Sequence, residues 1–229
     1  MATTRRAARA LVLTLASLAS AALAQGCHNK VAPPPEQDRP QGFGSRTLWL
    51  AFRGATPQAV AKALDLREVA PLSWVAGVAA SYAGRVFVTP PVDGWVLATS
   101  TRLPDVGGGQ QVDGATALLT RLSHQFDEVQ YFGTHQDIGW LAWARFVNGA
   151  PTRKFAYLAA HGAILWDEGA LTNEEHALGL DFGAKAVRDG AVPDERDVFA
   201  LAAKWSVDPS TLGQRLDVGS GLGGVLPPP

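Results

Sequence analysis

The sequence has little cysteine and little methionine, and both shortages narrow what the protein can do. Cys27 is the only cysteine, so no intrachain disulfide can form. The same count excludes thiolate zinc sites and a catalytic thiol inside the domain. Met1 is the only methionine, which excludes an adaptable methionine-lined groove. A chain of 229 residues with 47% hydrophobic residues is nevertheless large enough to bury a core without disulfides.

Positive charge is also scarce. The chain has five lysines against fifteen arginines, and its net charge is −1. Arg5, Arg6 and Arg9 precede residue 27; without them, 17 basic residues stand against 21 acidic ones, a balance of −4. Proteins that bind nucleic acid need a dense basic face to displace counterions, so this composition argues against a nucleic-acid partner.

The first 27 residues have the pattern of a bacterial export signal. The three arginines precede an uncharged apolar stretch, Leu11 to Leu23, which is too short to span a bilayer as a permanent helix. The next residues, Ala-Gln-Gly-Cys at 24–27, resemble the lipobox of bacterial lipoproteins, although Ala24 and Gln25 depart from its usual pattern. The resemblance implies a signal peptide over residues 1–26 and lipidation of Cys27. The alternative is cleavage after Ala24, which would release a soluble periplasmic or secreted protein.

Residues 27–45 are polar and rich in proline, with three consecutive prolines at 33–35. A segment with no apolar periodicity favours an extended tether between a membrane and a folded domain. An amino-terminal lipid with more than one acyl chain anchors stably, so the expected partner at this end is the membrane of the cell envelope. By the sorting rule for bacterial lipoproteins, His28 directly after the cysteine favours the outer membrane in a cell with two membranes.

Residues 46–212 are predicted to form a single α+β domain. Strands are expected at residues 47–53, 85–89, 95–100, 128–135, 137–148, 152–160 and 163–166. Helices are expected at residues 56–67, 74–82, 113–126, 172–178 and 193–205, with Thr56, Asp113 and Thr172 as caps. Because most strands follow one another directly, we expect a mostly antiparallel sheet of five to seven strands with helices packed on one face. Residues 138–147 are apolar at both even and odd positions, which predicts a central strand covered on both sides.

Residues 213–229 are rich in glycine and proline and are expected to form a loose tail. Residues 219–224 match the dinucleotide-binding pattern G-x-G-x-x-G. That site needs a strand before the glycines and a helix after them, whereas only five residues remain here, three of them proline. We therefore expect no nucleotide at this motif and no cofactor elsewhere.

His135 and Asp137 are the only pair that suggests chemistry. A carboxylate beside a histidine can orient a general base or a metal ligand. However, no serine in a nucleophile-elbow context accompanies them, and their spacing matches no metal signature. The simpler interpretation is a turn rich in hydrogen-bonding residues, so we predict neither a catalytic residue nor a metal site.

Seven tryptophans are many for this length. Exposed aromatic side chains can stack on the sugars of a cell wall or anchor a protein partner. Trp74 and Trp95 lie near breaks in the expected elements and are therefore the predicted ligand-binding residues.

Three stretches, Val88 to Trp95, Glu128 to His135 and Trp205 to Pro209, resemble those of uncharacterised bacterial proteins. The resemblance covers most of residues 47–212 and implies a recurrent domain, but it brings no activity and no site residue. With the anchor and the tether, it favours a non-enzymatic envelope lipoprotein that binds a protein or a cell-wall ligand. The alternatives are an envelope hydrolase that uses His135 and Asp137, and an immunity-type protein that neutralises a toxin.

Overall fold

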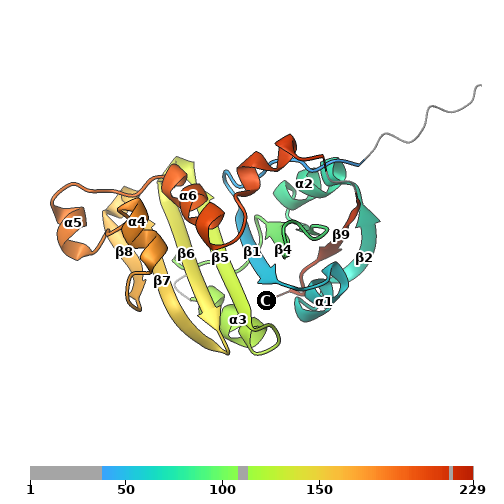
Figure 1. Ribbon diagram of the computed structural model, residues 1–229, viewed down its shortest axis with the longest axis horizontal. Helices are drawn as coiled ribbons and strands as arrows, with labels where there is room; N and C mark the ends of the chain where they lie inside the picture. Colours follow the sequence, from blue (N-terminus) through green and yellow to red (C-terminus); the bar gives the residue numbers. More distant parts are fainter. Residues whose placement is uncertain (1–37, 108–112, 217–218, 229) are drawn as a thin grey trace, which may run out of the picture. The chain divides into compact units, whose positions relative to one another are not determined.

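The computed structural model describes residues 38–107, 113–216 and 219–228, which form an α+β structure built on one sheet (Figure 1). Within these residues the sheet has nine strands in the order β2-β9-β3-β4-β1-β5-β6-β7-β8. Every pairing between neighbouring strands is antiparallel. The expected class and the antiparallel character of the sheet are confirmed, but the sheet is larger than the five to seven strands expected.

The strands are β1 (Leu48–Arg53), β2 (Arg67–Leu72), β3 (Val86–Val88), β4 (Trp95–Ser100), β5 (Glu128–His135), β6 (Trp140–Val147), β7 (Ala150–Leu158), β8 (Ala163–Glu168) and β9 (Gly221–Val225). The helices are α1 (Pro57–Ala63), α2 (Trp74–Tyr82), α3 (Gly114–Ser123), α4 (Asn173–Leu178), α5 (Ala184–Arg188) and α6 (Glu195–Trp205), with short 3-10 turns η1 (Gln136–Ile138), η2 (Ala159–His161) and η3 (Pro209–Gln214). Among the described residues, none of the helices combines the length and apolar character needed to cross a membrane.

The predicted helix caps are confirmed, because each depends only on nearby residues. The Thr56 hydroxyl accepts a hydrogen bond from the Ala59 N–H at 3.2 Å, with Pro57 at the first helical position. The Asp113 carboxylate accepts from the Thr116 N–H at 2.9 Å. Thr172 and the glutamate three residues later form a complete capping box at the start of α4.

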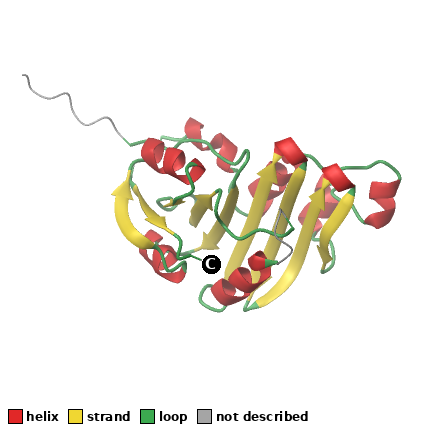
Figure 2. Ribbon diagram, turned by 180° about the vertical axis from the view of Figure 1, so that it is seen from behind, coloured by secondary structure: helices red, strands yellow, loops and turns green. Residues whose placement is uncertain are grey.

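Helices cover both faces of the sheet, which corrects the expectation that they pack on one face. Side chains of α1 and α3 join alternate residues of the strands in one hydrophobic core. Side chains of α2 and α6, with residues that follow α4, join the other alternate residues in a second core. Figure 1 shows α4 and α6 lying across β5 to β8, and Figure 2 shows α3 on the opposite face. Because side chains alternate along a strand, a sheet that is apolar on both faces needs cover on both.

Strand β6 shows this alternation most clearly, and it confirms the predicted strand that is covered on both sides. Trp140, Ala142, Ala144 and Phe146 belong to the first core. Leu141 and Trp143 belong to the second core, where Trp143 stacks on Phe155 with ring centroids 4.6 Å apart. The register of β6 is therefore determined by two apolar faces at once.

Strand β9 shows that the predicted loose tail is wrong. It lies inside the sheet, between β2 and β3. A Cβ atom on Gly223 would lie 2.2 Å from the Leu72 side chain, and one on Gly221 would lie 2.3 Å from the Val88 carbonyl oxygen. Only glycine allows the backbone to approach its neighbours so closely, so the motif that resembles a nucleotide site serves packing.

Strand β2 shows that the expected helix at residues 56–67 is too long. Helix α1 ends at Ala63, and Asp65 then adopts a positive φ of 53°, which turns the chain into β2. Residues 64–67, expected as the last turn of that helix, therefore form the turn before β2 and its first residue. A left-handed residue directly after the last helical turn ends a helix whatever apolar pattern follows it.

The end of the predicted tether packs on the domain, which corrects its boundary at residue 45. Phe43 is 5% exposed, and its N–H donates to the Pro209 carbonyl at 3.1 Å. The Asp38 carboxylate accepts hydrogen bonds from the Trp74 N–H at 2.7 Å and the Ser220 hydroxyl at 2.9 Å. Residues 38–45 thus belong to the folded body, while Cys27 and the signal segment lie outside the described residues.

Candidate functional site

A cavity of about 390 Å³ lies where one end of the β5–β8 part of the sheet meets the start of α6. Twelve residues line it: Thr134, His135, Gln136, Gly139, Trp140, Leu141, Ala159, Val192, Pro193, Asp194, Glu195 and Arg196. They come from the end of β5, the turn η1, the start of β6, the turn η2 and the segment that leads into α6. This volume falls within the range of ordinary small-molecule sites.

Two similar turns build one wall of the cavity. Each is a 3-10 turn that joins two neighbouring strands and ends at a left-handed glycine, Gly139 with φ 61° after η1 and Gly162 with φ 58° after η2. A Cβ atom on Gly139 would lie 2.5 Å from the Ala159 Cβ, so the two turns lie directly against each other. This wall is therefore made of two short turns whose backbones approach closely, which glycine allows.

The start of α6 forms the opposite wall. Asp194 caps the helix in a capping box with Asp197. The side-chain hydrogen bond from Arg196 is the main cause that lowers the pKa of Asp194, whereas burial is the main cause that raises the pKa of Asp197. An ion pair joins Asp194 to Arg196 at 2.5 Å. Both charges of this pair are therefore satisfied within the wall itself.

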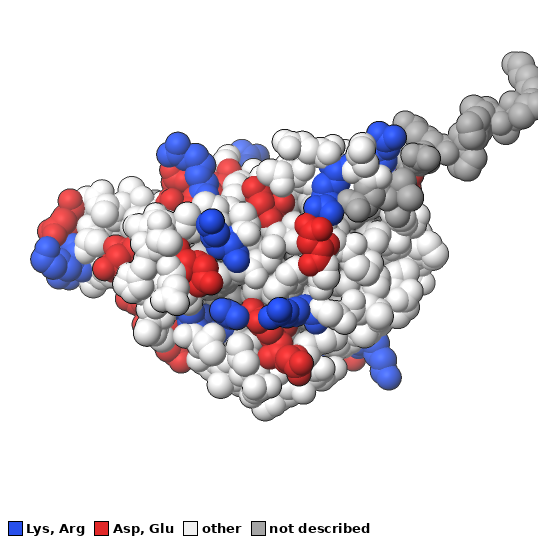
Figure 3. Space-filling view, in the orientation of Figure 1, with Lys and Arg blue, Asp and Glu red and all other residues white. Residues whose placement is uncertain are grey.

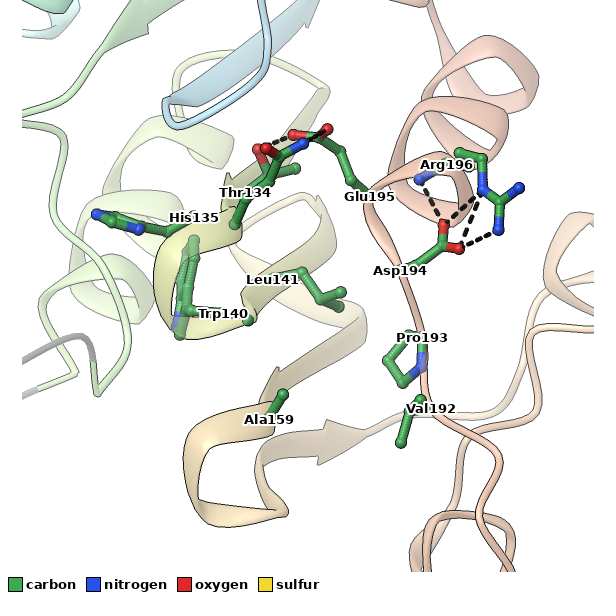
Figure 4. Close-up of a pocket in the computed structure, with 12 residues that line it drawn as sticks. Thr134, His135, Trp140, Leu141, Ala159, Val192, Pro193, Asp194, Glu195 and Arg196 are labelled. Atoms are coloured by element: carbon green, nitrogen blue, oxygen red, sulfur yellow. Dashed lines mark hydrogen bonds and ion pairs between the residues drawn. The ribbon is translucent and has the colours of Figure 1, made fainter.

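Glu195, the first residue of α6, reaches from this wall to the end of β5. Its Oε1 atom lies 2.8 Å from the Thr134 hydroxyl, and its Oε2 atom accepts a hydrogen bond from the Gln136 side-chain amide (Figure 4). Thr134 is 2% exposed, and its hydroxyl also lies 2.9 Å from the Gly44 carbonyl oxygen. The carboxylate thus joins two parts of the chain that are 61 residues apart in sequence.

Apolar groups complete the cavity below this carboxylate. In Figure 4 the side chains of Leu141, Ala159, Val192 and Pro193 point toward the hollow from both walls. Leu141 is 4% exposed and belongs to the second core, whereas Val192 is 55% exposed at the rim. The cavity therefore combines an apolar floor with one polar end.

His135 and Asp137 do not form the pair that the hydrolase alternative requires. His135 is exposed, and Figure 4 shows its ring pointing away from the apolar floor. The Asp137 carboxylate pairs with Arg46 at 2.6 Å, and no hydrogen bond to His135 is found among the described residues. His135 borders the cavity, but its ring is not oriented by a carboxylate.

The predicted ligand-binding tryptophans lie elsewhere, and Trp74 is a correction. Trp74 is 1% exposed and packs edge-on against Phe87 with ring centroids 5.5 Å apart. It follows the capping residue Ser73 and points into the second core, because the break before it is a helix start and not an exposed loop. Trp95 is half-buried and packs against the same core. Neither side chain lines the cavity.

Metal binding gains no support from the described part of the chain, where no group of three or more His, Cys, Asp or Glu side chains could hold an ion. A second hollow of about 310 Å³ lies beside η3. Its Asp93 is joined to Arg215 by two hydrogen bonds of 2.7 and 2.9 Å. Both of these charges already have a partner, so we regard the cavity at the start of α6 as the candidate site.

Sequence reasoning missed Glu195 and Thr134. Glu195 looks like an ordinary acidic residue in the first turn of a helix, and Thr134 like one position of a strand. Nothing local in the sequence shows that they meet. Comparisons of the chain with protein-family models, with curated proteins and with solved structures find no match.

Proposed function

We propose that this protein is a cell-envelope lipoprotein whose domain binds a ligand, without catalysing a reaction, in the cavity at the start of α6. The proposal for the envelope rests on the export pattern of residues 1–26 and on the lipobox-like residues before Cys27. The partner that we propose for the N-terminal end is accordingly a membrane, reached through the acyl chains.

The observation that carries the binding proposal is the cavity itself. It is bounded by two packed turns and a helix start, and it offers an apolar floor with one polar end. Sites that bind small ligands or single side chains of a partner combine these features, because apolar contact supplies affinity and a few polar groups supply orientation. The ligand we propose is a protein or cell-wall component that presents a group with an apolar part for the floor and a polar part for the polar end.

The contacts of Asp137 favour binding over hydrolysis. A histidine that acts as general base is usually held by a carboxylate or another acceptor, and here the nearest candidate in sequence is paired with Arg46. Arg46 is exposed and the pair lies at the surface, so this carboxylate is occupied outside the cavity. We therefore propose that His135 is part of the wall and not a reacting group.

Filling the cavity tests the proposal. Ala159 lines it and is exposed, so Ala159→Trp should fold while blocking the hollow; Ala160→Trp, at the next exposed alanine, is the matched control. We expect backbone amide NMR spectra recorded with a library of small apolar and aromatic compounds to show shifts at residues 134–141, 192 and 194–196. The shifts should disappear in Ala159→Trp and persist in Ala160→Trp. Turnover of ester or peptide substrates that His135→Ala abolishes would reject the proposal.

A further inference from the structure

The charges that line the cavity do not balance. Asp194 and Glu195 are acidic and Arg196 is basic, so carboxylates outnumber guanidinium groups in the lining by one. Arg196 is already committed to Asp194 at 2.5 Å. The excess charge therefore lies on Glu195, at the polar end of the cavity.

The partners of Glu195 are neutral. Its two oxygens receive one hydrogen bond each, from the Thr134 hydroxyl and the Gln136 amide. A carboxylate has about four lone-pair positions, so these two bonds leave further acceptor capacity. Among the described residues, no lysine, arginine or histidine forms an ion pair with it.

The neighbouring side chains supply no cation either. Arg46 contributes its backbone N–H to Thr134 at 3.1 Å, but its guanidinium is held by Asp137. The negative charge of Glu195 also affects Tyr82. Burial is the main cause that raises the pKa of Tyr82, and the charge of Glu195 raises it further. A partly buried carboxylate without a counter-charge gains most from a ligand that brings one.

The apolar floor determines what the cation is attached to. Leu141, Ala159, Val192 and Pro193 offer only carbon atoms of their side chains to a ligand. A bare metal ion would leave this surface unused, and an anion would be repelled by the carboxylate. We infer that the cavity binds a primary ammonium or guanidinium group carried on a short apolar stem, with Glu195 as the group that recognises the cation.

This inference rests on the proposed binding function. A charged and an uncharged probe of the same shape test the preference for a cation separately from binding itself. The first probes are n-butylammonium and n-butanol, which have the same stem and differ in charge. We expect the intact mature protein to bind n-butylammonium at least about tenfold more tightly than n-butanol, because a charge-assisted hydrogen bond is stronger than a neutral one. Affinities are read from NMR titration of the amides at residues 134–141.

Glu195→Gln is the decisive variant, since it keeps the size and one acceptor of the side chain and removes its charge. It should abolish the preference for n-butylammonium while n-butanol binding stays within about twofold. Glu174→Gln, at a partly exposed glutamate in the first turn of α4, is the control and should keep the preference. If Glu195→Gln does not fold, the salt dependence of binding to the wild-type protein tests the same point. Sodium chloride should weaken n-butylammonium binding and leave n-butanol binding unchanged.

The source of the cation is distinguished by a third probe, a short peptide with one internal lysine and blocked ends. Tighter binding of the peptide than of n-butylammonium points to a side chain of a polymer, and equal binding points to a free amine; both support the inference. Equal affinity for n-butylammonium and n-butanol would overturn the inference and leave the binding function standing. Failure of both small probes and the peptide to bind would overturn the proposed function as well.

Discussion

At the scale of single residues, the side chain of Glu175 accepts four hydrogen bonds. It is 0% exposed, and its Oε1 atom accepts hydrogen bonds from Trp143 and Arg153, each at 2.8 Å. Its Oε2 atom accepts from the Thr172 N–H at 2.8 Å and the Thr172 hydroxyl at 2.9 Å. One buried carboxylate therefore caps α4 and attaches it to β6 and β7.

We expect Glu175→Ala to lower the free energy of unfolding by about 3–5 kcal/mol, since it leaves a buried arginine without one of its two carboxylate partners. Arg153 is 2% exposed, and it keeps the partly exposed Asp167 carboxylate at 2.8 Å and the Lys154 carbonyl oxygen at 3.0 Å. Urea denaturation measures the loss. Glu174→Ala in the same helix turn is the control and should change stability by no more than about 0.5 kcal/mol. Equal effects of the two substitutions would contradict the role of the buried carboxylate.

Because of Tyr131, we expect the free energy of unfolding to fall as the pH rises above about 10. Burial is the main cause that raises its pKa well above the usual 10.0, and the charges of Asp105 and Asp113 add to the effect. Above pH 10 the phenol ionises in the unfolded chain but stays protonated in the fold, so the folded state binds more protons. The stabilisation is therefore complete below the unfolded pKa and is lost as the pH rises toward the folded pKa, by up to about 1.4 kcal/mol per pH unit.

Tyr131→Phe tests this dependence. At pH 8 the substitution should cost about 1 kcal/mol, because the hydroxyl donates to the Pro104 carbonyl at 3.3 Å. Between pH 10 and 11 the free energy of unfolding should fall less steeply in the variant than in the wild type, since one ionising group has been removed. Urea unfolding curves at several pH values measure both effects. Parallel pH profiles would contradict the prediction.

At the scale of secondary structure, the glycines of β9 decide whether the sheet closes between β2 and β3. Gly221→Ala would place its Cβ 2.3 Å from the Val88 carbonyl oxygen, which only a backbone shift can relieve. We expect a loss of about 1–3 kcal/mol in the free energy of unfolding, again from urea denaturation. Gly183→Ala is the control, because its Cβ would meet nothing closer than 3.7 Å. If both substitutions were neutral, β9 would not pack as described.

Elements also differ in how far the sequence predicts them. The strands from β5 to β8 were predicted because β-branched and aromatic residues fill them and turn residues separate them. Strand β9 was not, since glycine has no side chain and therefore no pattern; its pairing comes from β2 and β3. Strand β2 was missed because a left-handed Asp65 interrupts what reads as a helical stripe.

At the scale of the whole molecule, we propose that the N-terminal segment determines where in the cell the domain works. The described chain begins at Asp38, which is bonded to the first residue of α2 and to Ser220 just before β9. A tether would therefore join the body beside α2. Charged side chains of both signs are interspersed over the face drawn in Figure 3.

Mass spectrometry of protein extracted from membranes tests the proposed lipidation of Cys27 and attachment to a membrane. We expect a mature peptide that begins at Cys27 and carries acyl mass, and we expect Cys27→Ser to move the protein to the soluble fraction. His28→Ala is the control, because it changes the tether and keeps the acylated side chain. A mature terminus at Gln25 with an unmodified cysteine would instead support soluble export.

The sequence by itself determined the local features of this protein: helix caps, most strands, their turns and the apolar character of β6 on both sides. These depend on residues within a few positions of one another, so their physics is visible in a short window. Only the tertiary structure decided that β9 enters the sheet, that Trp74 is buried and that Glu195 meets Thr134. Those outcomes depend on close approach between segments far apart in the chain, and no local pattern encodes such an approach.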